Sequence, residues 1–139
     1  MFHVEHPERA AQQFVGAGIS ATPEQIAQIE ECQQVLLSWN CKVNLVSKKT
    51  EPHIISRHVI DSLVILDQIP SGSRLKVMDL GSGGGFPGIP LMVFRPGLRC
   101  DLVESRKKKA DFLSRALGEL GLDQGRVVCE RAESLSCCT

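Results

Sequence analysis

The sequence lacks the features that would assign it to several specialised classes of protein. Lys and Arg number 16 and Asp and Glu number 16, so the formal net charge is zero and no overall field favours binding to nucleic acid. No apolar run approaches the roughly 20 residues that a membrane span needs. The first residues also lack the basic and then apolar order of a signal peptide. These absences predict a cytoplasmic protein without membrane contacts, in which any nucleic-acid contact comes from local basic patches.

The six cysteines do not form a metal-binding pattern. No two of them are spaced as Cys-x-x-Cys, and no His-x-x-x-His pair accompanies them, so a structural zinc site is not predicted. Apolar residues make up 42% of the chain, an ordinary value for a folded domain. The cysteines therefore count as small apolar residues.

The first half of the chain has helical patterns. Thr22 can cap a helix whose first turn contains Pro23, and Gln25 completes a capping box. Apolar residues then recur every three or four positions as far as Trp39, which predicts a helix over residues 23–39. A turn with a short extended piece over residues 43–46 is expected next. A second helical region is then predicted from Pro52 to a point before Pro70.

The second half alternates strands and helices. Strands are predicted over residues 75–80, 100–104 and 126–129, with helices over 89–94 and 107–120 between them. A β-α-β-α-β order implies a parallel sheet with right-handed crossovers. The predicted organisation is a helical cap over residues 1–70 and an α/β part over residues 71–139, with the boundary near residues 71–73.

A glycine-rich loop directly follows the first predicted strand. Its pattern is Asp79-x-Gly81-x-Gly83-x-Gly85. Glycine allows a sharp turn and lets a ligand approach where a Cβ would block it. In open α/β sheets ligands bind beyond the carboxyl ends of the strands. The loop therefore predicts a cofactor site, in preference to a tight turn without a ligand.

Two classes of cofactor match this loop. Gly83-x-Gly85-x-x-Gly88 agrees with the dinucleotide fingerprint, and Glu104 follows about 20 residues on, where a ribose-binding acid is expected. Glu104 suits the ribose of either class. The order of Asp79 before Gly81 favours S-adenosylmethionine. Pro87 and Pro90 also reduce the number of N–H groups available to a pyrophosphate.

Several longer blocks together carry a family resemblance. They are Trp39-Asn40-x-Lys42-x-Asn44-Leu45, Arg57-His58-x-x-Asp61-Ser62-Leu63, the run from Asp79 to Leu91, Leu102-Val103-Glu104-Ser105 with Lys108, Phe112 and Leu113, and Arg131-Ala132-Glu133. Over residues 19–133 the chain resembles the ribosomal RNA guanine-N7 methyltransferases of the bacterial small subunit, the glucose-inhibited division protein B family.

The resemblance implies a fold, a reaction and a set of site residues. The fold would be a Rossmann-like class I methyltransferase sheet, of which the first three parallel strands are present, with an N-terminal helical cap. The reaction would be methyl transfer from S-adenosylmethionine to N7 of a guanine in 16S ribosomal RNA. The cofactor-binding residues that the resemblance implies are Gly81, Phe86, Glu104, Ala132 and Glu133. The glycine loop itself adds Gly83.

No catalytic acid or base is assigned, because guanine N7 carries a free lone pair and no proton. Lys107, Lys108 and Lys109 are candidates for RNA contacts, although a solvated helix face also explains such a run. Arg57 and His58 are candidates too, with a structural role for His58 and Asp61 as the alternative. Trp39 is expected to be a core anchor more often than a base-stacking platform.

The resemblance also leads to an expectation of C-terminal truncation. A further family contact, an arginine in a later Ser-Arg-Ala segment, has no counterpart in this sequence. We therefore keep an inactive cofactor-binding fragment as an alternative function, and an NAD-dependent enzyme as a third. An incomplete sheet would leave one edge of the 75–80 strand unpaired, and self-association through that edge is expected.

Overall fold

The computed structural model describes residues 8–71 and 75–135. The elements, in chain order, are α1 (Ala10–Ala17), α2 (Pro23–Asn40), the 3-10 turn η1 (Glu51–His53), the π-helical turn η2 (Ile55–Val59), α3 (Ile60–Val64), the 3-10 turn η3 (Ile65–Gln68), β1 (Lys76–Leu80), α4 (Gly88–Phe94), β2 (Arg99–Val103), α5 (Lys107–Leu120), β3 (Gly125–Val128) and the 3-10 turn η4 (Ala132–Ser134). The predicted order of strands and helices in the second half is confirmed.

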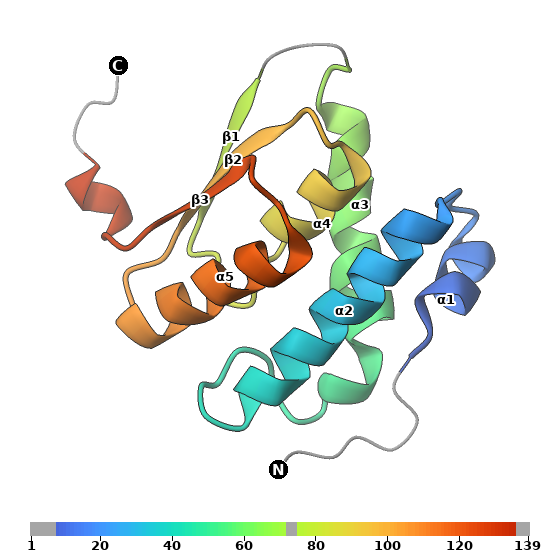
Figure 1. Ribbon diagram of the computed structural model, residues 1–139, viewed down its shortest axis with the longest axis horizontal. Coiled ribbons are helices and arrows are strands. Elements are labelled where there is room, and N and C mark those ends of the chain that lie inside the picture. The colour runs from blue at the N-terminus through green and yellow to red at the C-terminus, as the bar shows by residue number, and fades with distance from the viewer. Residues whose placement is uncertain (1–7, 72–74, 136–139) are drawn as a thin grey trace.

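The three strands form one parallel sheet in the order β1-β2-β3 (Figure 1). Two right-handed crossovers in the same direction put α4 and α5 on the same face. Helix α2 packs against both of them. Cys100 and Leu102 of β2 are buried among these helices, so the hydrophobic core lies on one side of the sheet. The α/β fold with a Rossmann-like parallel sheet is confirmed.

Helix α2 begins as the sequence predicts. The Thr22 hydroxyl accepts a hydrogen bond from the Gln25 N–H at 3.1 Å, and the Gln25 side chain accepts one from the Thr22 N–H at 2.8 Å. The two bonds satisfy N–H groups that the first turn would otherwise leave without partners. Ile29 and Leu36 on its apolar side are fully buried.

The loop after α2 contains turns and bends, so the extended piece expected over residues 43–46 is wrong. The backbone of this loop forms hydrogen bonds with the buried side chain of Asn40 and not with a neighbouring strand. Its Oδ1 accepts hydrogen bonds from the N–H groups of Leu45 at 2.8 Å and Val46 at 3.0 Å. Its Nδ2 donates to Oε2 of the buried Glu51 at 2.8 Å. One amide thus fixes the loop to both of its flanking helical segments.

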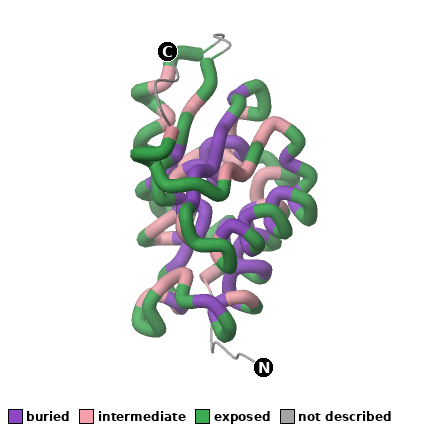
Figure 2. The backbone as a smooth tube through the Cα atoms, turned by 90° about the vertical axis from the view of Figure 1, so that its left-hand side faces the viewer, coloured by how far each residue is buried: buried purple, intermediate pink, exposed green. Residues whose placement is uncertain are grey.

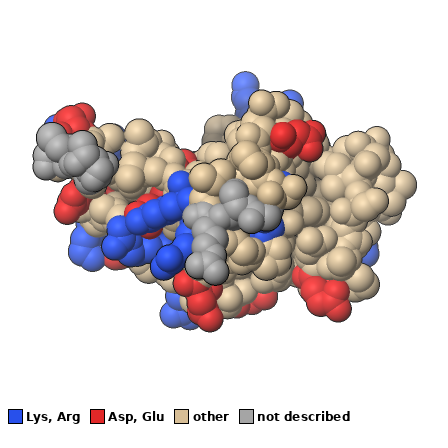
Figure 3. All heavy atoms as spheres, turned by 90° about the horizontal axis from the view of Figure 1, so that it is seen from above, with Lys and Arg blue, Asp and Glu red and all other residues tan. Residues whose placement is uncertain are grey.

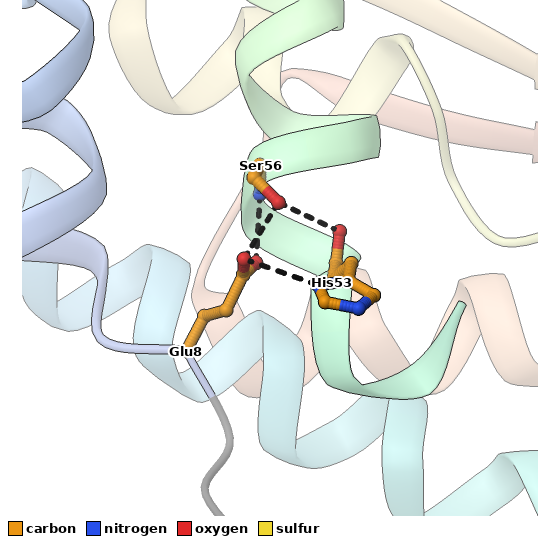
Figure 4. A network of polar contacts seen from close by, with 3 residues as sticks. All are labelled: Glu8, His53 and Ser56. Carbon is orange, nitrogen blue, oxygen red and sulfur yellow. Dashed lines mark hydrogen bonds and ion pairs between the residues drawn. The ribbon is translucent and has the colours of Figure 1, made fainter. Parts of the chain in front are cut away.

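The second helical region lies where it was predicted, but it is divided into η1, η2, α3 and η3. Glu8 ties the N-terminal segment to it (Figure 4). The Glu8 carboxylate accepts hydrogen bonds from the Ser56 N–H at 2.8 Å and the Ser56 hydroxyl at 2.6 Å, and lies 3.8 Å from His53 Nδ1. These bonds hold α1 beside η2.

Strand β1 lies at an edge of the sheet. It pairs with β2 on one side, and no strand of the described chain pairs with its other side. Met78 and Leu80 point away from the helices and are 45% and 56% exposed. In Figure 2 buried stretches run through the centre of the molecule and the outer turns are exposed. The helices therefore cover one face of the sheet, and the opposite face is exposed along β1 at Met78 and Leu80.

The two predicted parts of the chain share one hydrophobic core. Phe14 and Leu36 from the helical part belong to the same buried cluster as Leu102 and Leu113 from the α/β part. The predicted boundary near residues 71–73 lies mostly outside the described residues, and the division stays a prediction. Within the described ranges no helix has the length and apolar character to cross a membrane.

Candidate functional site

A hollow of about 310 Å³ lies at the carboxyl ends of the strands, and we refer to it as the strand-end hollow. Parallel strands bring their carboxyl ends to the same edge, where the chain turns from each strand toward the following segment. The residues that line it are Gly81, Val103, Glu104, Ser105, Glu130, Arg131, Ala132 and Glu133. Segments following all three strands therefore contribute to one site.

Glycine at two positions of the loop has a physical reason. Gly81 has a φ of +71°, which side chains other than glycine rarely adopt, and a Cβ there would meet no protein atom within 4 Å. The space beside Gly81 belongs to the strand-end hollow. At Gly88 a Cβ would lie 2.4 Å from Leu102 Cδ2. The second glycine lets α4 pack closely on β2, whereas the first leaves room for a ligand.

Glu104 is a buried carboxylate that connects the glycine loop to the start of α5. Its Oε1 accepts a hydrogen bond from the Gly83 N–H at 2.9 Å, and its Oε2 accepts one from the Arg106 N–H at 2.9 Å. An ionised carboxylate has about four acceptor positions. Glu104 therefore keeps acceptor capacity toward the hollow that it lines, where hydroxyl donors of a ligand can reach it.

Asp79 holds the opposite end of the loop. Its Oδ2 accepts a hydrogen bond from the Gly88 N–H at 3.1 Å, at the first residue of α4. Burial raises the pKa of Asp79 to about 6, and the hydrogen bonds from Gly88 and Ser82 oppose this rise. Asp79 does not line the strand-end hollow. Its carboxylate therefore acts on the loop backbone and not on a ligand.

Four of the six predicted cofactor-binding residues line the strand-end hollow: Gly81, Glu104, Ala132 and Glu133. The other two, Gly83 and Phe86, do not line it. Gly83 donates its N–H to Glu104, and Phe86 stacks on His58 with ring centroids 4.9 Å apart and an interplanar angle of 16°. The sequence-derived set missed Val103, Ser105, Glu130 and Arg131, although Val103 and Ser105 directly flank the predicted ribose acid.

His58 joins the helical cap to the glycine loop through this stacking. Burial lowers its pKa, with the charge of Asp61 raising it and that of Arg57 lowering it further. The ring is consequently biased toward its neutral form, which suits packing against an apolar ring. Arg57, in contrast, is exposed. The two candidates for RNA contacts in this segment thus have different surroundings.

The three lysines at positions 107–109 also differ in their surroundings. Lys107 donates to Asp111 Oδ1 at 2.9 Å. Lys108 and Lys109 instead line a hollow of about 370 Å³ with residues that the sequence-derived set did not include. We refer to this hollow as the basic groove, and its lining residues are Lys42, Val43, Asn44, Arg106, Lys108 and Lys109. Figure 3 views the molecule from above, from the side opposite to the start of α5 in Figure 1, and shows that Lys and Arg side chains also occur away from this groove.

A larger hollow, of about 740 Å³, lies between α1 and α2. Its lining is polar and consists of Glu8, Arg9, Gln12, Gln13, Glu30, Gln33 and Gln34. None of these residues belongs to the motifs that carry the family resemblance. The strand-end hollow, although smaller, gathers the glycine loop and the predicted ribose acid, so we take it as the candidate site.

The family model and the relatives that match this chain have the same description. Residues 25–137 match the family described as rRNA small subunit methyltransferase G. A protein of Pelotomaculum thermopropionicum named ribosomal RNA small subunit methyltransferase G is 41% identical over 118 residues, which are 85% of this chain and 49% of that protein. A protein of the same name from Chromobacterium violaceum is 34% identical over 93% of this chain and 61% of its own length. The chain spans about half the length of the curated relatives it matches.

The raised pKa of Asp79 predicts a pH dependence of stability. Its ordinary value is 3.8, so the folded state takes up a proton near pH 6, before the unfolded state does. Protonation of Asp79 therefore stabilises the folded state relative to the unfolded state. This contribution is complete below pH 3.8 and is lost as the pH rises through 6. Asp79→Asn keeps an acceptor for the Gly88 N–H without the charge. We expect this substitution to reduce the pH-dependent change in the free energy of unfolding by up to about 3 kcal/mol.

Urea denaturation between pH 4 and 7 measures this effect. Asp101→Asn is the matched control. Burial alone would raise the pKa of Asp101, but hydrogen bonds and charges of Arg126 and Lys76 outweigh burial and lower that pKa. Asp101 therefore contributes stability that is lost as the pH falls. If Asp79→Asn retains the pH profile of the unaltered chain over this range, the assignment to Asp79 is wrong.

Proposed function

Because this chain belongs to the rRNA small subunit methyltransferase G family, we propose that it binds S-adenosylmethionine in the strand-end hollow for methyl transfer to N7 of a guanine in 16S ribosomal RNA. The observation that supports this most is the meeting of Gly81, which has no side chain, with the buried carboxylate of Glu104 at one hollow. The proposed location is the cytoplasm.

The residues around the strand-end hollow fit this cofactor. Its volume of about 310 Å³ lies within the range of small-molecule sites. The unused lone pairs of Glu104 suit two ribose hydroxyls, and the open space beside Gly81 suits close approach to the backbone. We assign Ala132 and Glu133 to the opposite wall. Gly83 would act by orienting Glu104, and Phe86 would reach the cofactor at the edge of the site.

The chemistry requires positioning more than proton transfer. When bound, S-adenosylmethionine supplies a methyl group made electrophilic by the adjoining sulfonium. Guanine N7 has a free lone pair and no proton to remove, so no side chain needs to act as a general base. The chain has to hold the two groups in line and exclude water. Asp79 and Glu104 serve this by fixing the backbone of the glycine loop.

The proposed partner is 16S ribosomal RNA, free or within the small ribosomal subunit. Candidates for RNA contacts are Arg57, His58, Lys108 and Lys109, whereas Lys107, which the sequence also suggested, is paired with Asp111. Exposed Arg57 and the lysines supply positive charge, whereas the stacked His58 would act through Phe86. Transfer of a labelled methyl group to small-subunit RNA, followed by identification of 7-methylguanine, tests the complete reaction.

Cofactor binding without methyl transfer is the second candidate function. The observation that favours it is that the chain spans about half the length of the relatives it matches. Binding of S-adenosylhomocysteine together with no labelled product would support this candidate. Binding of NAD in place of S-adenosylhomocysteine would support the third, a dehydrogenase, and would contradict the methyltransferase proposal.

We also propose that the chain self-associates through β1. Within residues 8–71 and 75–135 no strand pairs with the outer edge of β1, so another chain can pair with its N–H and C=O groups, and Met78 and Leu80 add exposed apolar surface beside it. Sedimentation velocity should show a concentration-dependent increase in mass, which Met78→Lys with Leu80→Lys reduces. A chain that stays monomeric at every concentration would contradict this proposal.

Gly81→Ala tests the cofactor site with a close control. The new methyl group would enter the strand-end hollow, so affinity for S-adenosylhomocysteine should fall about tenfold or more, which corresponds to about 1.4 kcal/mol. Gly121→Ala is the control, because Gly121 ends α5 with a φ of +65° and also has no atom within 4 Å of an added Cβ. Both variants should lose about 1 kcal/mol of stability through backbone strain.

Calorimetric titration measures binding by the two variants, and thermal unfolding measures their stability. Only Gly81→Ala should lose affinity. Equal affinity of the two variants would exclude the space beside Gly81 from the cofactor site.

A further inference from the structure

The basic groove combines two segments that are far apart in the sequence. Lys42 and Asn44 come from the loop after α2, and Arg106, Lys108 and Lys109 come from the start of α5. Four cationic side chains therefore line one hollow, and no carboxylate lines it. Like charges gathered in this way repel one another and destabilise the fold slightly. A ligand that carries negative charge would relieve this repulsion.

The four cations of the groove take part in none of the ion pairs between described residues. Within the described ranges the ion pairs involve other residues, among them Lys107 with Asp111 and Arg115 with Glu119 on the same helix. Lys107 is thus paired with an acidic residue of its own helix. Lys108 and Lys109, the next two residues, have no such partner among the ion pairs of the described chain.

The walls of the groove are held in place by packing and hydrogen bonds. Trp39 packs edge-on against Phe112 of α5, with ring centroids 5.9 Å apart, which joins the end of α2 to α5. The Lys42 ammonium lies 5.6 Å from the centroid of the same Trp39 ring, an arrangement that favours a cation over the ring face. The Asn40 side chain fixes the backbone of the adjoining loop. The cations are therefore presented on a preorganised surface.

The groove adjoins the strand-end hollow. Ser105 lines the hollow and Arg106, the next residue, lines the groove. The Arg106 N–H donates to Glu104 Oε2, so one backbone turn forms part of both sites. A polyanion lying in the groove would pass beside the proposed position of the methyl donor.

We propose that the basic groove binds the sugar-phosphate backbone of the substrate RNA through Lys42, Arg106, Lys108 and Lys109, with Lys107 outside the contact. This inference rests on the proposed function for the identity of the polyanion. An acidic peptide fits less well, because peptide docking usually depends on buried apolar or aromatic anchors. Of the described residues that line the groove, Val43 alone is apolar, and it is itself buried. Phosphates need only positive charge and hydrogen-bond donors, which the lysines, Arg106 and the Asn44 amide supply.

Salt-dependent binding of a 16S ribosomal RNA transcript tests the proposal. Removing one cation that neutralises a phosphate should reduce the slope of log affinity against log salt concentration by about 0.7 to 0.9. We expect this reduction for Lys42→Ala, Arg106→Ala, Lys108→Ala and Lys109→Ala, measured one at a time. Lys107→Ala is the matched control from the same helical turn and should leave the slope unchanged. Circular dichroism checks that every variant is folded.

Two outcomes of the salt titration would overturn the proposal. One is an equal reduction of the slope by Lys107→Ala and Lys108→Ala, which would indicate a diffuse basic surface. The other is an unchanged slope when all four groove residues are replaced together. Binding of a polyglutamate peptide that competes with the RNA and depends equally on the four residues would assign the groove to a protein partner instead. Titration with S-adenosylhomocysteine is a separate readout, so failure of the cofactor proposal can be distinguished from failure of the groove.

Discussion

Two buried carboxylates hold the backbone of the glycine loop, and the candidate site depends on them. Asp79 accepts the N–H of Gly88, where α4 begins, and Glu104 accepts the N–H of Gly83 from the neighbouring strand. A loop rich in glycine has many accessible conformations, and ordering it costs entropy. Hydrogen bonds between N–H groups and carboxylates are stronger than those between neutral groups. They give the loop one conformation before any ligand arrives.

The geometry of these contacts follows from the sheet. Because β1 and β2 are adjacent and in register, Asp79 lies opposite Leu102 and the end of β1 lies opposite the end of β2. The glycine loop after β1 therefore meets Glu104 directly after β2. The same arrangement puts α4 and α5 on one face, so the apolar cluster lies on that side, and the opposite face is exposed along β1 at Met78 and Leu80.

Positive charge is concentrated in one place on this chain, although the chain as a whole is neutral. The net charge is zero, yet the cations of the basic groove lie together without carboxylates among them. The turn through Ser105 and Arg106 joins this groove to the strand-end hollow. A protein of zero net charge can in this way have a positive surface beside the strand-end hollow, whose own wall carries the carboxylate of Glu104.

The sequence by itself determined the features that depend on neighbouring residues. The capping box of α2, the bounds of α5 and the order of strands and helices were predicted because caps and apolar periodicity act within a few residues. The glycine loop and Glu104 could be selected for a similar reason, since their motif follows a strand at short spacing. The family resemblance added Ala132 and Glu133.

The tertiary structure alone decided the features that depend on residues far apart in the chain. Asn40 gives the following loop its turns through side-chain hydrogen bonds that replace an expected strand. His58 meets Phe86, and Lys42 meets Arg106, only when the helical cap packs on the α/β part. Adjacent lysines looked equivalent in the sequence. In the structure Lys107 pairs with Asp111, which lies four residues further along α5 on the same side of the helix, whereas Lys108 and Lys109 line the groove.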